Sequence, residues 1–232
     1  MSERFRIGLA WGVHLFTASG ALVGVLALLA VHRGDLRAAA LLMLLGLAID
    51  SLDGSLARAV GVARLLPGFD GRRLDDMVDY LNYVVVPCVF LAAGGLVPHW
   101  AAVVPPILAS AYGFSQVDAK TEDDFFLGFP SYWNVIAIYA WLLEVDPRLT
   151  AAIVAGFALL VFVPLKYVYP SKLHAWKRTT YALTAAAAAA VAWSVLEPER
   201  ARALRVAQIS LLYPACYFFL SLHLGGWLRR RA

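Results

Sequence analysis

Long apolar stretches follow one another along the chain, and short segments rich in charge, Pro or Gly separate them. A helix that crosses the hydrocarbon core of a bilayer needs about 20 predominantly apolar residues. The pattern therefore predicts an all-α integral membrane protein, a helical bundle with about eight transmembrane helices. They cover residues 9–31, 36–59, 71–97, 99–117, 131–145, 149–165, 179–196 and 203–228.

The composition agrees with this pattern. Of the 232 residues, 61% are apolar and only 16% are charged, and the mean hydropathy is +0.69. Because the predicted spans use most of the chain, we expect residues 1–232 to form a single transmembrane domain. Arg4 and Arg6 precede the first apolar run as in a signal peptide, but its length and the lack of a clear cleavage site favour a retained helix. Cys88 and Cys216 lie apart in apolar runs, which supports neither a disulfide framework nor a zinc site.

The basic residues indicate an orientation. If both ends of the chain lie in the cytoplasm, the segments on that side carry most of the 20 Lys and Arg residues, as the positive-inside rule requires. The net charge of +4 then reflects topology and contact with anionic lipid. Since no basic and aromatic face lies outside the spans, we expect no nucleic-acid partner.

Four carboxylates lie inside or beside the second and third predicted spans: Asp50, Asp53, Asp75 and Asp79. An acid near the middle of a membrane helix costs roughly 2.5 to 3.5 kcal/mol on insertion scales, so such residues usually have a function. The first two are three residues apart and the last two are four apart, so each pair projects from one face of its helix. A tight connection between the two helices can bring the pairs together.

Such a group of hard oxygen ligands suits Mg²⁺ or Mn²⁺, and two ions bridged by shared carboxylates are a common device for moving phosphoryl groups. Gly54, Ala57 and Gly71 lie near the acids, where small side chains would let a nucleotide or diphosphate approach the backbone. The guanidinium of Arg58 could bind phosphate oxygens in bidentate fashion. The sequence therefore predicts a metal-dependent phosphoryl-transfer site.

Two other interpretations of the acids remain open. They could form interfacial salt bridges with Arg58, Arg64, Arg72 and Arg73, or serve as a proton or ion relay in a cation-coupled transporter. A transporter, however, gives no reason for small residues followed directly by Arg58. Its acids would also be spread over distant helices or inverted repeats, which the sequence does not show.

Residues 50–79 resemble the signature of the CDP-alcohol phosphotransferase family, D-x2-D-G-x2-A-R followed by G-x3-D-x3-D, with every fixed position present. The spacer between the two halves, residues 59–70, is longer than is usual in that family. This spacer, with Leu66-Pro67 and the run from Asp79 to Tyr83, resembles the bacterial phosphatidylcholine synthase branch. Residues 14–20 and 118–134 agree with that branch, whereas the last two spans carry no motif.

The resemblance implies the family's helical bundle and a phosphatidyltransferase activity. Such enzymes transfer the phosphatidyl group of CDP-diacylglycerol to choline and release CMP. The reaction requires a divalent metal and takes place on the cytoplasmic face of the bacterial inner membrane. The resemblance also implies a homodimer. By the resemblance, the four aspartates hold two Mn²⁺ or Mg²⁺ ions, and Asp79 is also the candidate general base. Gly54, Ala57 and Gly71 admit the CDP moiety, Arg58 contacts phosphate, and His14 and Thr17 lie near the nucleotide.

A sister enzyme that uses serine, inositol or glycerol phosphate is the alternative. Choline differs from these acceptors because its quaternary ammonium has no hydrogen-bond donor and requires aromatic faces and negative charge. Tyr and Trp also gather at membrane interfaces whatever the substrate, so a purely interfacial role stays open. The candidates for the choline site are Tyr80, Tyr83, Tyr112, Tyr132, Trp133, Asp118, Glu122 and Asp123.

Overall fold

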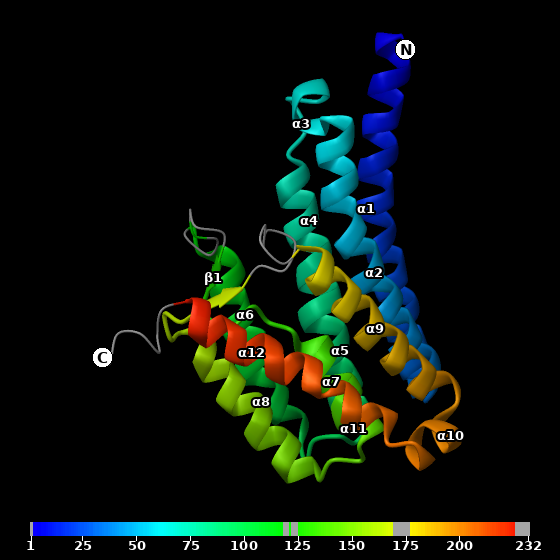
Figure 1. Cartoon of the computed structure of the whole chain (residues 1–232), viewed down its shortest axis with the longest axis vertical. Coiled ribbons are helices and arrows are strands. Elements are labelled where there is room, and N and C mark those ends of the chain that lie inside the picture. Colours follow the sequence, from blue (N-terminus) through cyan, green and yellow to red (C-terminus); the bar gives the residue numbers. More distant parts are fainter. Residues whose placement is uncertain (1, 118–120, 122–124, 169–176, 226–232) are drawn as a thin grey trace.

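Helices make up most of the computed structural model, which describes residues 2–117, 121, 125–168 and 177–225. The chain begins with a long helical hairpin, α1 (Glu3–His32) and α2 (Leu36–Val60), whose two helices lie side by side (Figure 1). Asp35 caps α2 by accepting a hydrogen bond from the Ala38 N–H, and Gly61 ends it in the left-handed conformation. A short helix, α3 (Val62–Leu65), and a turn lead into α4 (Gly71–Asp79).

The predicted spans correspond closely to the helices. Within the described residues, five helices are long and apolar enough to cross a membrane: Glu3–His32, Leu36–Val60, Gly71–Ala93, Thr179–Leu196 and Val206–Leu224. Three shorter apolar helices, Trp100–Ser115, Trp133–Leu142 and Pro147–Val161, occupy the other three predicted positions. The structure therefore has the expected all-α membrane character, while the shorter helices leave the number of full crossings a prediction.

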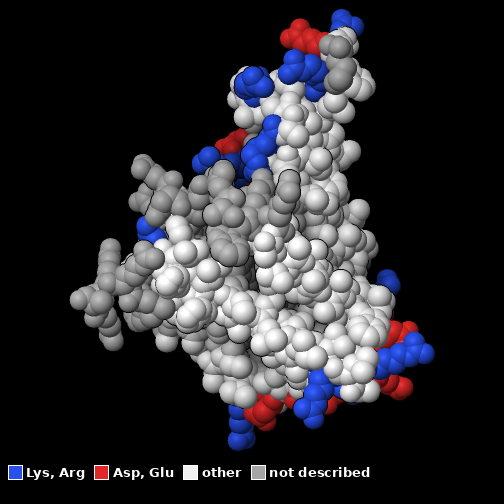
Figure 2. All heavy atoms as spheres, viewed as in Figure 1, with Lys and Arg blue, Asp and Glu red and all other residues white. Residues whose placement is uncertain are grey.

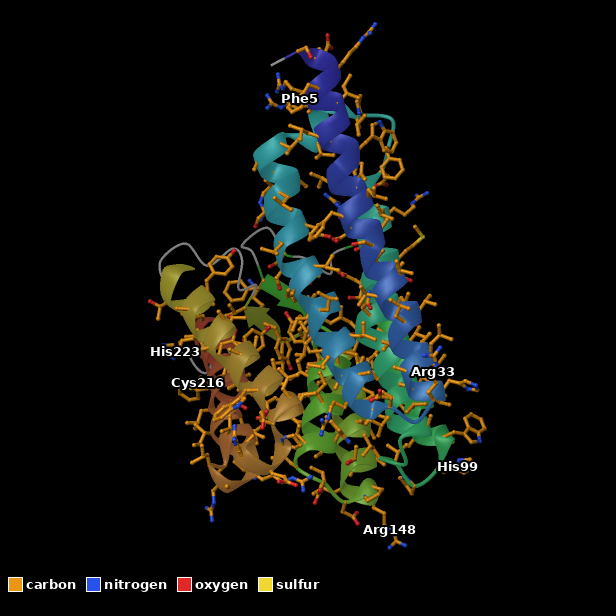
Figure 3. The ribbon with its side chains drawn as sticks, turned by 90° about the vertical axis from the view of Figure 1, so that its right-hand side faces the viewer. Phe5, Arg33, His99, Arg148, Cys216 and His223 are labelled. Atoms are coloured by element: carbon orange, nitrogen blue, oxygen red, sulfur yellow. The ribbon has the colours of Figure 1, made fainter. Side chains whose placement is uncertain are left out.

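The surface has the character expected of a membrane protein. Large apolar side chains such as Leu15, Leu22 and Leu159 are exposed, and most of the charged residues visible in Figure 2 lie toward the two ends of the molecule. Figure 3 shows Phe5 at one end, with Arg33, His99 and Arg148 toward the other. An apolar belt between two charged ends is the distribution that a bilayer requires.

Asn82 joins α1, α2 and the third span at their closest approach. Its side-chain N–H groups donate to the Gly20 carbonyl at 3.0 Å and to the Val78 carbonyl at 3.1 Å. A Cβ added at Gly24 would lie 2.9 Å from the Asn82 Oδ1, and one at Gly46 would lie 3.1 Å from it. Glycines therefore let the three helices pack around one buried amide, as small residues commonly do between membrane helices.

The third span is not a regular α-helix. After α4, residues Tyr80–Val85 form a π-helical segment, η1, and α5 (Val86–Ala93) completes the span. Pro87 has no N–H to donate to the carbonyl four residues earlier, and its ring would clash with that carbonyl in a regular helix. The wider π turn, which begins directly after Asp79, accommodates this proline.

The remaining described helices complete the bundle. Trp133 fixes the start of α7 (Trp133–Leu142) against α6 (Val104–Ser115), because its indole N–H donates to the Ser110 hydroxyl at 2.7 Å and this hydroxyl also pairs with Ser131. The elements are η2 (Trp100–Val103), a 3₁₀ turn, followed by α6 (Val104–Ser115), α7 (Trp133–Leu142), α8 (Pro147–Val161), α9 (Lys177–Leu196), α10 (Pro198–Ala203), α11 (Val206–Ser210) and α12 (Leu212–Leu224).

A small β-ribbon is an addition to the expected all-α fold. Strand β1 (Phe125–Leu127) pairs antiparallel with β2 (Lys166–Val168), so that Phe126 lies opposite Tyr167. Helix α12 holds β2 because the Tyr217 hydroxyl donates to the Val168 carbonyl and the Ser221 hydroxyl accepts from the Val168 N–H. Burial raises the pKa of Tyr167 to about 12. The ribbon thus ties the segment before α7 to the C-terminal helix.

Candidate active site

Three of the four aspartates meet between α2 and α4. Asp50, Asp75 and Asp79 each offer a carboxylate oxygen, and these oxygens all lie within 4.8 Å of one another. Asp50 comes from the C-terminal half of α2, whereas the other two lie one turn apart on α4. All three side chains are half-buried. The spacing of the acids in the sequence predicted that acids from the two helices would meet, and these three do.

Asp53 completes the acidic group from a more buried position. It is 5% exposed, and its carboxylate lies beside the Thr17 hydroxyl of α1 and the Asp75 side chain. Arg58, one turn further along α2, is close enough to interact electrostatically with it. Thr17, which the sequence placed near the nucleotide, therefore lies in contact with the acidic group.

His14 lies one turn before Thr17 on α1, in a small aromatic cluster. Its ring centroid is 4.4 Å from that of Phe69 and 5.9 Å from that of Trp11. A Cβ added at Gly71 would lie 2.6 Å from the His14 Cε1, so only glycine fits at the start of α4 beside this ring. The His14 Nε2 is buried without a hydrogen-bond partner. The cluster brings His14 and Gly71, both predicted to contact the CDP moiety, to the same place.

The other predicted phosphate-binding and nucleotide-binding residues lie on the last turns of α2. Arg58 is exposed, and its guanidinium donates to the Ser55 hydroxyl at 3.2 Å. Gly54 lies under this guanidinium, since an added Cβ would be 3.3 Å from the Arg58 Nη1. Ala57 packs against the apolar cluster of Ala10, Val13 and Val62. Arg58 and Gly54 therefore border the acidic group, whereas Ala57 contributes to the contact between α1 and α2.

A row of tyrosines begins at the acidic group. The Tyr83 hydroxyl donates to the Asp50 Oδ2 at 2.5 Å. The Tyr83 ring lies 5.9 Å from that of Tyr132, and Tyr132 lies 6.0 Å from Tyr217. These tyrosines come from η1, from the residue before α7, and from α12. The row thus brings three distant parts of the sequence next to one carboxylate.

The other aromatic candidates for choline binding have different partners. The Tyr80 hydroxyl donates to the Ile107 carbonyl, and the Tyr112 ring packs on Phe162. Trp133 is fully buried, and its indole N–H donates to the Ser110 hydroxyl. Of the predicted aromatic residues, Tyr83 and Tyr132 interact with the acidic group through Asp50. The acidic candidates Asp118, Glu122 and Asp123 lie outside the described residues.

Tyr217 is the residue of this row that sequence reasoning missed. It stands in the last span, which carries no motif, so nothing in the local pattern distinguishes it from other interfacial tyrosines. The sequence did indicate the position of Tyr83 near the acids, because Asp75, Asp79 and Tyr83 follow one another at four-residue spacing. Residues at that spacing continue one face of a helix.

The donor set fits a divalent cation. Carboxylate oxygens are the ligands that Mg²⁺ and Mn²⁺ prefer, whereas imidazole and thiolate suit zinc and copper. Among the described residues, this group contains aspartates and neither His nor Cys. Three carboxylates held this close repel one another, and a bound cation would remove that repulsion.

Comparison with known proteins supports the resemblance seen in the sequence. The chain is 47% identical over 170 residues to the phosphatidylcholine synthase of Legionella pneumophila, a match that covers 71% of this chain and 66% of that protein. It is 34% identical over 228 residues to the phosphatidylcholine synthase of Borreliella burgdorferi, covering 96% of this chain and 97% of that protein. The Pseudomonas aeruginosa phosphatidylcholine synthase is 38% identical over 178 residues, which is 75% of each chain. The chain matches no family-wide sequence model.

Proposed function

Because this chain belongs to the phosphatidylcholine synthase family, we propose that it transfers the phosphatidyl group of CDP-diacylglycerol to choline, giving phosphatidylcholine and CMP. The observation that carries this proposal is the convergence of Asp50, Asp75 and Asp79, with Asp53 beside them. With divalent cations bound to it, an acidic group between membrane helices, next to small residues and an arginine, would be suited to a diphosphate that arrives from the lipid phase.

The four aspartates would hold two Mn²⁺ or Mg²⁺ ions, which, when bound, neutralise the diphosphate and the departing CMP. Arg58 is suited to a phosphate oxygen at the edge of the site, since its guanidinium is exposed beside Gly54. On α1, His14 lies beside Gly71 and Thr17 lies beside Asp53. In this arrangement the nucleotide lies along α1, and the phosphates lie over the carboxylates.

Asp79 is the proposed general base. The choline oxygen attacks the phosphorus of the phosphatidyl group, its proton passes to the Asp79 carboxylate, and the bond from that phosphorus to the CMP oxygen breaks. A carboxylate next to cations is a weak base, so its contribution depends on position more than on basicity. Its place at the end of α4, directly before η1, supports this role because the tyrosine row begins there.

We propose that the choline head lies against Tyr83 and Tyr132. A quaternary ammonium is attracted to the faces of aromatic rings, and nearby carboxylates add electrostatic attraction. The ring centroids of these two tyrosines are 5.9 Å apart, and Tyr83 contacts Asp50 directly. This arrangement would place the acceptor next to Asp79 and the nucleotide on the opposite side of the acidic group.

The basic residues support a cytoplasmic site in a bacterial inner membrane. Four arginines lie on α2, α3 and α4 near the connection between the two helices that carry the aspartates, as the positive-inside rule expects of a cytoplasmic end: Arg58, Arg64, Arg72 and Arg73. The proposed homodimer rests on the family resemblance alone.

One assay tests the function directly. Purified protein in detergent is incubated with CDP-diacylglycerol, Mn²⁺ or Mg²⁺, and choline, serine, inositol or glycerol phosphate in turn, and the lipid product and CMP are identified by mass spectrometry. We expect phosphatidylcholine and equimolar CMP with choline only. A product with another alcohol identifies a sister enzyme, whereas choline flux into liposomes without CMP would indicate a transporter.

The tyrosine row gives a prediction about the acceptor. Replacing Tyr132 by Ala should raise the choline KM by about tenfold, because a cation–π contact contributes on the order of 0.5 to 2 kcal/mol. Tyr132→Phe keeps the ring face and should retain a nearly normal choline KM. Steady-state kinetics with each substrate varied separately provide the measurement.

The KM for CDP-diacylglycerol is the internal control, and it should stay the same in both variants. Tyr112→Ala serves as the matched control, since that tyrosine is exposed against Phe162. A parallel rise in both KM values for Tyr132→Ala would point to a folding effect and count against the choline contact.

A further inference from the structure

The hydrogen bond between Tyr83 and Asp50 links the two helices that carry the aspartates. It is 2.5 Å long and joins η1 to α2. An O–H group that donates to a carboxylate forms one of the shorter and stronger hydrogen bonds found in proteins. Tyr83 is 6% exposed, so its hydroxyl makes this contact away from competing bulk water. The bond therefore constrains Asp50 more firmly than a contact at the surface would.

Tyr83 is itself held in place from two directions. Its ring packs against Tyr132, which in turn contacts Tyr217 of α12. Its backbone belongs to the π segment that precedes Pro87, and neighbouring Asn82 anchors that segment to α1 through the Gly20 carbonyl. A side chain fixed in this way can orient its hydrogen-bond partner, because it does not follow the partner when that partner rotates.

An aspartate needs such a partner to hold one orientation. The terminal torsion of Asp is broad and roughly two-fold, so a carboxylate without a fixed partner samples many rotations. The phenol occupies one acceptor position on Oδ2 and thereby fixes the plane of the Asp50 carboxylate. It also offsets part of the repulsion among three carboxylates that approach within 4.8 Å.

The geometry points to Tyr83 as a positioning residue that orients Asp50 toward Asp75 and Asp79 for binding of a divalent cation. This inference rests on the proposed function, since it assigns the acidic group to a metal. It gives Tyr83 a role separable from its ring face: the hydroxyl acts on the cation site through Asp50, and the ring lies toward the acceptor.

Tyr83→Phe separates the two roles, because it removes one oxygen and keeps the ring. Binding of Mn²⁺ to the purified protein, without substrates, is measured from the electron paramagnetic resonance signal of free Mn²⁺. We expect binding to weaken by about tenfold or more, the effect typical of removing a hydrogen-bond partner of a metal ligand.

Two further variants make the result specific. Tyr139→Phe is the matched control. Tyr139 lies on α7, and the substitution removes a buried tyrosine hydroxyl that pairs with the Ser210 hydroxyl at 2.8 Å. It should leave Mn²⁺ affinity unchanged, and thermal unfolding in detergent compares the stability of the two variants. Asp50→Asn should weaken Mn²⁺ binding by itself, and adding Tyr83→Phe to it should cause little further loss, because the hydroxyl acts through that carboxylate.

Mn²⁺ affinity decides the inference, and product identity decides the function. If Tyr83→Phe binds Mn²⁺ as the unchanged protein does, or if its effect adds fully to that of Asp50→Asn, the positioning role is wrong while phosphatidylcholine synthesis stands. If the unchanged protein makes phosphatidylcholine but binds no Mn²⁺ in this group, the inference also fails. A protein that binds Mn²⁺ with the expected dependence on Tyr83 but makes no phosphatidylcholine retains the positioning role and loses the proposed function.

Discussion

Asp79→Asn is expected to lower kcat by at least about 100-fold while binding of CDP-diacylglycerol stays measurable. Proton transfer by a positioned side chain contributes on the order of 10² to 10⁴ to rate, and an amide can neither accept the proton nor supply the same negative charge. Asparagine has nearly the same shape as aspartate, so the packing around the end of α4 should survive. Turnover and equilibrium binding of the CDP-lipid to the same purified preparation are the two measurements.

Asp76→Asn is the matched control for this substitution. Asp76 lies on the same helix, between Asp75 and Asp79, and is outside the group of carboxylates that converge. Its replacement removes one negative charge from α4 and should leave kcat nearly unchanged, because Asp76 contributes no oxygen to the converging group. Near-normal turnover of Asp79→Asn, or an equal loss in both variants, would rule out the base assignment.

Removal of divalent metal is expected to have an effect of similar size. Dialysis against EDTA should lower turnover by at least about 100-fold, because neutralisation of phosphoryl charge by metals contributes several kcal/mol and each 1.36 kcal/mol is tenfold in rate. Addition of Mn²⁺ or Mg²⁺ should restore it. The physical reason lies in the donor set: Asp50, Asp75 and Asp79 bring three carboxylate oxygens within 4.8 Å of one another, and such oxygens are the ligands that Mg²⁺ and Mn²⁺ prefer.

The thermal stability of the protein provides an independent measurement of metal binding. A ligand that binds only the folded protein stabilises it by about 2.7 kcal/mol at a concentration 100 times its Kd, so Mn²⁺ should raise the unfolding temperature in detergent. The shift should be smaller in Asp75→Asn and unchanged in Asp76→Asn. Full turnover in EDTA, with bound metal shown by mass spectrometry to be below one ion per chain, would contradict a metal-dependent mechanism.

The positions of the helices along the chain were predictable because hydrophobicity is a local property of the sequence. Apolar runs bounded by charge, Pro and Gly located most helix ends to within a few residues, for example 36–59 against Leu36–Val60 and 149–165 against Pro147–Val161. The run at 131–145 contained only the shorter helix Trp133–Leu142, because Ser131 adopts a positive φ and the turn before the helix uses part of the run. Length and hydropathy thus predicted where helices form, but not how much of each run is helical.

The convergence of the acids also followed from the sequence. Spacings of three and four residues direct each pair of aspartates to one helix face, and the short connection through α3 brings α2 and α4 together. The β-ribbon was not predicted, because its strands are three residues long and pair across the chain. The π segment had a local signal in Pro87, whose missing N–H interrupts a regular helix.

The sequence by itself determined the class of protein, the position of its helices and the pairing of Asp50 and Asp53 with Asp75 and Asp79, since each depends on residues close together in the chain. Only the tertiary structure decided which aromatic residues meet these acids. Tyr83, Tyr132 and Tyr217 come together, whereas Tyr80, Tyr112 and Trp133 pack elsewhere. The reason is that helical periodicity fixes the face on which a side chain lies, but the crossing of distant helices fixes what that face meets.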